Sequence, residues 1–237
     1  TLLLEETYDS ALKISAVPDA AGADLEHTIV KTMMRIDLPR PLAHSEKTTF
    51  SIAWSYRIPN AKLYAMRTGW EYFEKDKNYI YEIAQWFPRM AVYGDTTGWQ
   101  NKQYLGRGEF TLEFGDYVVR LTVPNDHIVS GTGVLQNAAE VLTAAQRDRL
   151  KQAETAQSPV FIVTPDEAKK AEAGQPTGKK TWIFKADNVR DFAFASSRKF
   201  IWDAMGAPQH ASPDPKHPVM AMSFYPNEGE PLWSKYS

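Results

Sequence analysis

The sequence predicts a mainly β protein, a β-sandwich or an open pair of curved sheets, with one or two short helices at its periphery. Three observations predict this class. Large and small or polar residues alternate with period two over several stretches, as in strands with one buried face. Turn-forming residues separate these stretches at regular intervals, which is typical of sandwiches. Aromatic residues, which favour strands and large cores, make up 12% of the 237 residues.

The clearest strand signal is an alternation over residues 48–58. Every second residue from Phe50 to Ile58 is aromatic or apolar, and the residues between them are small or polar, except for one arginine. This pattern predicts a strand with one buried face. Residues 28–38 are its predicted partner, because two prolines break the chain just beyond them. The pair would form a hairpin with a long turn near Ser45.

Further strands are predicted along the rest of the chain. In residues 117–123, aromatic or aliphatic side chains alternate with a second set that includes an arginine and a threonine. Gly131 and Gly133 lie inside another strand pattern, where glycine marks a bulge or a close approach of two backbones. The remaining predicted strands are residues 109–114, 127–134, 160–164, 181–185, 190–196 and 219–225.

Two short helices are predicted between these strands. Residues 137–152 begin with Asn137 and Glu140, which resemble a capping box. Residues 165–174 follow Thr164 and carry proline at the first helical position. Both helices are polar and are expected to lie outside the sheets.

Composition and charge exclude several classes of function. With 43% hydrophobic and 24% charged residues, the chain is in the ordinary globular range. A net charge of -2 and a pI near 6.2 give no electrostatic basis for binding nucleic acid or an anionic membrane. No apolar run is long enough to span a bilayer. There is no cysteine, so disulfides, thiolate nucleophiles and cysteine zinc sites are all excluded.

No catalytic or metal-binding motif occurs in the sequence. It contains no H-E-x-x-H, no G-x-S-x-G, no phosphate-binding loop and no dinucleotide fingerprint. His210 and His217 lie in a proline-rich loop that is expected to be solvated, and His127 is expected to make a buried polar contact. Glu228 and Glu230 are expected at the surface, with no pocket implied. No catalytic residue and no metal ligand are therefore assigned to this chain.

Residues 84–95, AQWFPRMAVYGD, followed by Gly98 and Trp99, resemble the N-terminal domain of bacterial zinc metallopeptidases of the aminopeptidase N family. The resemblance extends over about residues 28–237, and its pieces keep the family's order. The other matching pieces are GRGEF at 106–110, GDY at 115–117, VP at 123–124, TGVL at 132–135, TWIF at 181–184, DFAFA at 191–195, FYP at 224–226 and PLW at 231–233.

The resemblance implies that residues 1–225 form a non-catalytic accessory domain, a β-sandwich or saddle-shaped arrangement of curved sheets, that covers the catalytic domain and helps to shape the substrate cleft. This domain would lack its first strands, and residues 226–237 would begin the link to the catalytic domain. Zinc would be bound in the catalytic domain of the parent enzyme, by an H-E-x-x-H motif and a distant glutamate. No cofactor is expected in this chain. A periplasmic or secreted location is favoured by the family.

The implied partners are the chain's own catalytic domain and the N-terminus of a peptide substrate, and neither nucleic acid nor a membrane is expected. Self-association of this chain through open sheet edges is also expected. In the family, a Gln or Glu of this domain binds the free α-amine of the substrate by charge-assisted hydrogen bonds. The nearest match is Gln85, followed by Glu82, although the local spacing departs from the family's pattern. The alternative for Gln85 is an ordinary residue at a strand end.

Two other functions compete with the peptidase reading. A carbohydrate-binding β-sandwich is suggested by the tryptophans, because exposed aromatic rings stack on sugars, although Trp54 and Trp182 are expected to be buried. An interaction domain unrelated to peptidases is the third possibility. The tryptophans that suggest the second reading are Trp70, Trp86, Trp99, Trp182, Trp202 and Trp233.

Overall fold

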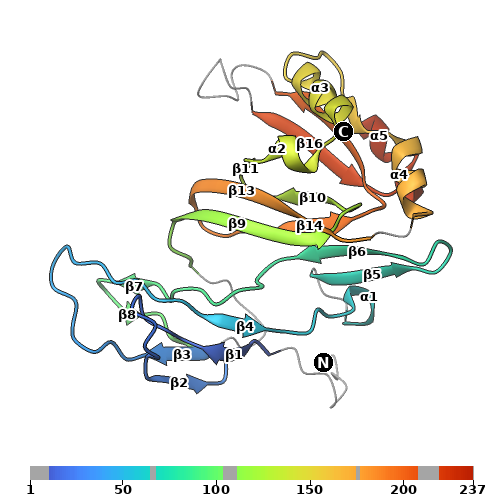
Figure 1. Cartoon of the computed structure of the whole chain (residues 1–237). Helices are drawn as coiled ribbons and strands as arrows, with labels where there is room; N and C mark the ends of the chain where they lie inside the picture. The colour runs from blue at the N-terminus through green and yellow to red at the C-terminus, as the bar shows by residue number, and fades with distance from the viewer. Residues whose placement is uncertain (1–10, 65–67, 104–110, 175–176, 208–218, 237) are drawn as a thin grey trace. The chain divides into compact units, whose positions relative to one another are not determined.

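The computed structural model describes residues 11–64, 68–103, 111–174, 177–207 and 219–236. Its fold is mainly β, with 41% strand and 15% helix in several antiparallel sheets, so the predicted fold class is confirmed (Figure 1). Five short α-helices occur in the described residues, more than the one or two expected. The chain divides into two compact units: residues 1–59 with 85–115, and residues 60–84 with 116–237.

The first unit contains three small two-stranded sheets. They pair β1 with β4, β2 with β3 and β7 with β8. The side chain of Trp54 packs against Trp86 and donates a hydrogen bond to the Trp86 carbonyl at 3.0 Å. The strands are β1 (Lys13–Ala16), β2 (His27–Val30), β3 (Met33–Ile36), β4 (Ala53–Ser55), β7 (Tyr93–Gly94) and β8 (Gly98–Trp99).

The hairpin predicted from residues 28–38 and 48–58 is wrong. The alternation of half-buried and exposed residues is present over residues 50–58, but only β4 forms there, and it pairs with β1. Residues 28–38 instead fold back on themselves as β2 and β3. Lys31 makes this turn possible with a φ of 54°, and Gln103 accepts a hydrogen bond from the next backbone N–H.

The second unit contains three larger sheets, in the orders β10-β14-β6-β5, β11-β13-β9 and β12-β15-β16. Helices α3 and α4 pack against the last of these sheets (Figure 1). The elements are α1 (Ala61–Tyr64), β5 (Gly69–Phe73), β6 (Asn78–Ile83), β9 (Gly115–Pro124), β10 (Ile128–Gly131), β11 (Val134–Leu135), α2 (Ala138–Val141), α3 (Ala144–Ala153), β12 (Val160–Val163), α4 (Pro165–Glu172), β13 (Lys179–Val189), β14 (Phe194–Ser197), β15 (Ile201–Gly206), β16 (Met220–Tyr225), η2 (Asn227–Gly229) and α5 (Trp233–Tyr236).

The core of the second unit is aromatic and aliphatic. Trp182 and Phe192 are fully buried, each near the ring of Phe184, and Ile162 and Ile201 are fully buried as well. Burial of such large rings is the main favourable contribution to the stability of a domain of this size.

The strand expected at residues 109–114 is not formed by its described part, residues 111–114, and residues 109–110 lie outside the described residues. The predicted helix over residues 137–152 is split into α2 and α3. The side chain of Asn137 does not cap α2, because its amide bonds Glu140 and the strand β13 instead.

The capping box is found six residues later. The hydroxyl of Thr143 accepts a hydrogen bond from the backbone N–H of Gln146, and the Gln146 side chain accepts one from the Thr143 N–H. The helix start predicted after Thr164 is confirmed by α4, which has Pro165 in its first turn and also carries a capping box between Thr164 and Glu167.

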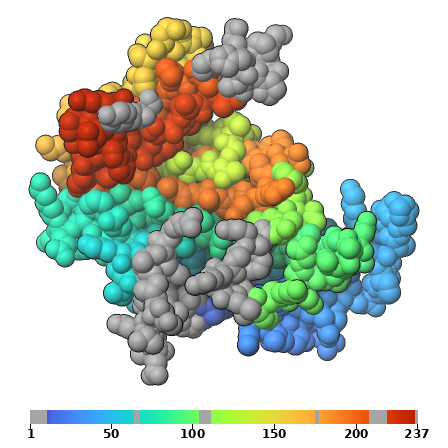
Figure 2. Space-filling model, turned by 180° about the vertical axis from the view of Figure 1, so that it is seen from behind, coloured from blue at the N-terminus to red at the C-terminus, as the bar shows by residue number. Residues whose placement is uncertain are grey.

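The β5–β6 hairpin has two chemically different faces. Antiparallel pairing places Glu71 opposite Ile80, and Tyr72 opposite Tyr79. Because side chains alternate along a strand, one face carries glutamates and apolar residues, and the other carries aromatic rings. The first face lies against the C-terminal segment of the same unit, and Figure 2 shows the two segments, in teal and red, side by side.

Candidate functional site

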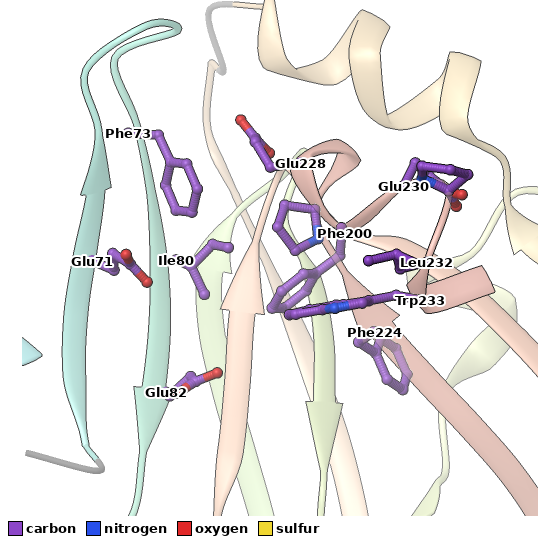
Figure 3. A pocket seen from close by; sticks show the side chains of 13 residues that line it. Glu71, Phe73, Ile80, Glu82, Phe200, Phe224, Glu228, Glu230, Leu232 and Trp233 are labelled. Atoms are coloured by element: carbon purple, nitrogen blue, oxygen red, sulfur yellow. The ribbon is translucent and has the colours of Figure 1, made fainter. Parts of the chain in front are cut away.

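The best candidate for a binding site is a cavity of about 320 Å³ inside the second unit. One wall is the first face of the β5–β6 hairpin. The other wall is formed by Phe200, by Phe224 of β16 and by residues 226–233, the C-terminal segment. Figure 3 shows the side chains of the two walls facing each other. A concave site with a few polar groups on an aromatic lining is the usual form of a small-molecule site.

The hairpin wall supplies two glutamates and two apolar side chains. Glu71 and Phe73 come from β5, and Ile80 and Glu82 from β6. Both glutamates are exposed, and none of the ion pairs formed by the described residues includes either of them. The cavity therefore has two carboxylates on this wall that are free to meet a ligand.

The C-terminal wall is closely packed around Trp233. A side chain at Gly229 would come within 2.8 Å of the Trp233 ring, so glycine permits this approach. The ring of Trp233 also meets Tyr225 edge-on, at 6.0 Å between centroids. The hydroxyl of Ser234 donates a hydrogen bond to Oε2 of Glu230 at 2.6 Å. The other oxygen, Oε1, is buried and accepts no full hydrogen bond from the described residues, and the Tyr225 hydroxyl interacts with the same carboxylate.

A buried lysine lies behind one end of the cavity and contacts two residues of its lining. Lys199 is fully buried, and its ammonium donates hydrogen bonds to Asp76, to Glu172 at 3.1 Å and to Glu228 at 3.1 Å. The same ammonium lies 4.7 Å from the centre of the Phe73 ring. Burial by itself lowers the pKa of Lys199, but the three carboxylates outweigh it and raise the pKa above its ordinary value.

The electrostatic character of the cavity is negative. Four glutamates are among its lining residues, and none of the lining residues is basic. Lys199 lies behind the wall and already binds Glu228, and it faces two further carboxylates. Four aromatic rings complete the lining, and the faces of such rings are themselves attractive to cations.

A buried histidine–serine pair lies elsewhere in the second unit. Nδ1 of His127 is 2.9 Å from the hydroxyl of Ser196, and both residues are buried. Burial lowers the pKa of His127 to about 4, and the negative charge of Asp126 opposes this shift with a smaller effect. The pair resembles a nucleophile and its base, but neither side chain is accessible to a substrate. The predicted buried polar contact of His127 is confirmed.

Glu82 and Gln85, the predicted amine-binding residues, have different surroundings. Glu82 lines the cavity, where it belongs to the second unit. Gln85 belongs to the first unit, at an exposed bend with a φ of 53°. It is not among the residues that line the cavity.

Glu228 is exposed, as expected, but the expectation that Glu228 and Glu230 belong to no pocket is wrong. Both line the cavity, because residues 227–229 form a 3₁₀ turn that folds the segment back against β16. Sequence reasoning also missed the strands β5 and β6, although the alternation in residues 78–83 could have revealed one of them. His210 and His217 lie outside the described residues.

Within the described residues, no group of three or more His, Asp or Glu side chains is arranged to hold a metal ion. None of the helices described has both the length and the apolar character required to cross a bilayer. Comparison with protein-family models, with curated proteins and with solved structures gave no match for this chain.

Proposed function

We propose that this chain is the non-catalytic N-terminal domain of an aminopeptidase N-like zinc metallopeptidase. It would cover the catalytic domain and help to shape the substrate cleft, and the zinc would be bound by that other domain. The observation that carries the proposal is the segment AQWFPRMAVYGD at residues 84–95, followed in family order by the other matching pieces. The mainly β fold is compatible with it.

The conformation of Gln85 supports a role for this residue in binding the substrate amine. Few residues other than glycine adopt a positive φ, and those that do often lie at functional sites. At Gln85 this conformation occurs directly before the Trp-Phe-Pro segment, with the side chain exposed. The amide oxygen of Gln85 could accept a hydrogen bond from the ammonium group of a peptide N-terminus.

The test uses the protein encoded by the full reading frame and aminoacyl-anilide substrates. We expect that protein to contain zinc and to hydrolyse these substrates, and residues 1–237 alone to do neither. Gln85→Ala should raise KM about tenfold, because a charge-assisted hydrogen bond is lost. Gln100→Ala, at another exposed glutamine of the same unit, should leave KM unchanged. Hydrolysis by residues 1–237 alone would contradict the proposal.

A second candidate function is carbohydrate binding by the aromatic face of the β5–β6 hairpin. The ring of Tyr79 lies 4.8 Å from that of Tyr72, 5.6 Å from that of Trp70 and 6.0 Å from that of Tyr81. Tyr72 is 39% exposed and Tyr79 is 41% exposed. Rows of exposed rings of this kind can stack on sugar rings, whereas Trp182 is fully buried and cannot.

This second candidate is tested by titrating a panel of glycans and following tryptophan fluorescence, since Trp70 contacts Tyr79 on the aromatic face of the hairpin. Binding that is lost in Tyr72→Ala and kept in Tyr93→Ala, an exposed tyrosine of the other unit, would support it. A flat response to every glycan removes it.

A further inference from the structure

We propose that the cavity between the β5–β6 hairpin and the C-terminal segment binds a small organic cation of the alkylammonium class. The inference depends on the cavity of the second unit alone and not on the proposed peptidase relationship. Its basis is the combination of a partly open cavity, aromatic walls and the two carboxylates of Glu71 and Glu82, which have no counter-ion among the described residues.

The protein already binds one ammonium group with the residues of this cavity. The ammonium of Lys199 lies over the ring of Phe73 and donates a hydrogen bond to the carboxylate of Glu228, and Phe73 and Glu228 both line the cavity. The chemistry of an aromatic face beside a carboxylate is therefore used at one end of the site, where the cation is part of the chain.

The rest of the cavity repeats this chemistry without a cation. Glu71 and Glu82 extend from the hairpin wall, opposite Phe224 and Trp233 (Figure 3). Oε1 of Glu230 is buried without a full hydrogen bond, and the Tyr225 hydroxyl, which donates to Asp203, is the described group that interacts with the same carboxylate. A buried carboxylate oxygen is costly unless a donor or a positive charge meets it. A bound ammonium group would supply both.

Other ligand classes fit the lining less well. An anion would be repelled by the four glutamates, and a neutral apolar molecule would bury carboxylates without neutralising them. The described residues offer no cluster suited to a metal ion. An alkylammonium ion combines a weakly hydrated charge, which favours ring faces, with an apolar surface for Phe200 and Phe224.

Isothermal titration calorimetry with choline and n-butylammonium tests the proposal. Each is compared with a neutral compound of the same shape: 3,3-dimethylbutan-1-ol for choline and butan-1-ol for n-butylammonium. We expect saturable binding of at least one cation, and binding of its neutral counterpart that is weaker by about tenfold or more. Equal binding of cation and neutral counterpart, or no saturable binding of either cation up to tens of millimolar, would overturn the proposal.

Variants locate the site. Glu82→Gln and Glu71→Gln keep the size of the side chain and remove its charge, and each should weaken binding about fivefold. Glu74→Gln, in the exposed turn of the same hairpin and outside the cavity lining, should leave binding unchanged. Trp233→Leu tests the ring, with circular dichroism to verify folding. Unchanged binding in all three cavity variants would place the ligand elsewhere and overturn the assignment.

The ammonium group could also be a lysine side chain of a peptide. Nα-acetyl-lysinamide is therefore titrated beside n-butylammonium. Tighter binding of the lysine derivative would identify a peptide as the source, and tighter binding of n-butylammonium would identify a free amine. Either result supports the same site, provided that Glu82→Gln weakens it.

Discussion

At the scale of single residues, burial determines the chemistry of His127. Its neighbours in the second unit include the Ser196 hydroxyl, the Tyr81 ring and the charges of Asp126, Arg198 and Lys180. Desolvation outweighs the one negative charge among them, so the neutral imidazole is favoured in the folded protein. A histidine beside a serine is therefore a structural pair here.

The lowered pKa of His127 predicts how stability depends on pH. The unfolded state binds a proton near the ordinary pKa of 6.5, whereas the folded state does so only near 4. The free energy of unfolding should therefore fall as pH falls from 6.5 to 4, by at most about 3 kcal/mol from this residue. In His127→Asn this part of the pH dependence should be absent, as measured by urea unfolding.

His44→Asn is the matched control, because His44 is exposed. It should keep the pH dependence of the unmodified protein. An identical slope in His127→Asn and in the unmodified protein would contradict the burial argument.

Lys199 is the second residue whose replacement has a defined consequence. Lys199→Met should lower the free energy of unfolding by about 3 kcal/mol or more, because it leaves partly buried carboxylates without their cation. Chemical unfolding of the variant and of the unmodified protein measures this loss.

Lys185→Met provides the comparison for this variant. Lys185 pairs with Asp187 at 3.0 Å, but both side chains are about half exposed or more. An exposed pair contributes about 1 kcal/mol or less. Similar losses in the two variants would show that the Lys199 cluster is no stronger than a surface pair.

At the scale of elements, the strand patterns were more predictable than the strand partners. Alternation predicted β9, and its inward residues are more buried than the residues between them. The partner of β4 was predicted wrongly, because alternation indicates that one face is buried and carries no information about which strand lies beside it. β15 was missed because its first four residues are all buried, so it shows no alternation.

The close approach predicted at the glycines of the 127–134 pattern is confirmed at Gly133. Its φ is 89°, and a Cβ there would lie 2.2 Å from the carbonyl oxygen of Lys185. Gly22 has nearly the same φ, 88°, but open space around the Cβ position. Comparing Gly22 with Gly133 therefore separates the cost of backbone strain from the cost of crowding between strands.

Gly22→Ala should cost about 1–2 kcal/mol, the strain of a left-handed conformation. Gly133→Ala should cost this and an overpacking penalty of about 1–3 kcal/mol as well. Thermal unfolding followed by circular dichroism in both variants provides the comparison. Equal costs would mean that β11 and β13 can separate without penalty.

At the scale of the whole molecule, the exposed edges and apolar side chains favour self-association. In the described part of the chain β16 pairs with β15 alone, and Met222 on this strand is 44% exposed. Unpaired strand edges with apolar side chains are the usual route to pairing between copies.

The cavity of the second unit could not be predicted from the sequence, because its walls are about 150 residues apart in the sequence and only the tertiary fold brings them together.

Because the edge of β16 is exposed, sedimentation equilibrium should show a molar mass that rises with protein concentration. Met222→Lys should shift the equilibrium towards the monomer, since a charge on an edge strand opposes pairing. Met90→Lys, at an exposed methionine outside the strands, should not change it. A single monomeric mass at all concentrations would contradict the expectation.

The Lys199 cluster also affects which substitutions the protein can tolerate during evolution. Three acids from the hairpin turn, from α4 and from the C-terminal segment share one lysine. Replacing one acid leaves two others to bind the ammonium, whereas replacing the lysine leaves all three without a counter-ion. Tolerance to mutation is therefore unequal within one cluster: the acids can drift one at a time, and the lysine at their centre cannot.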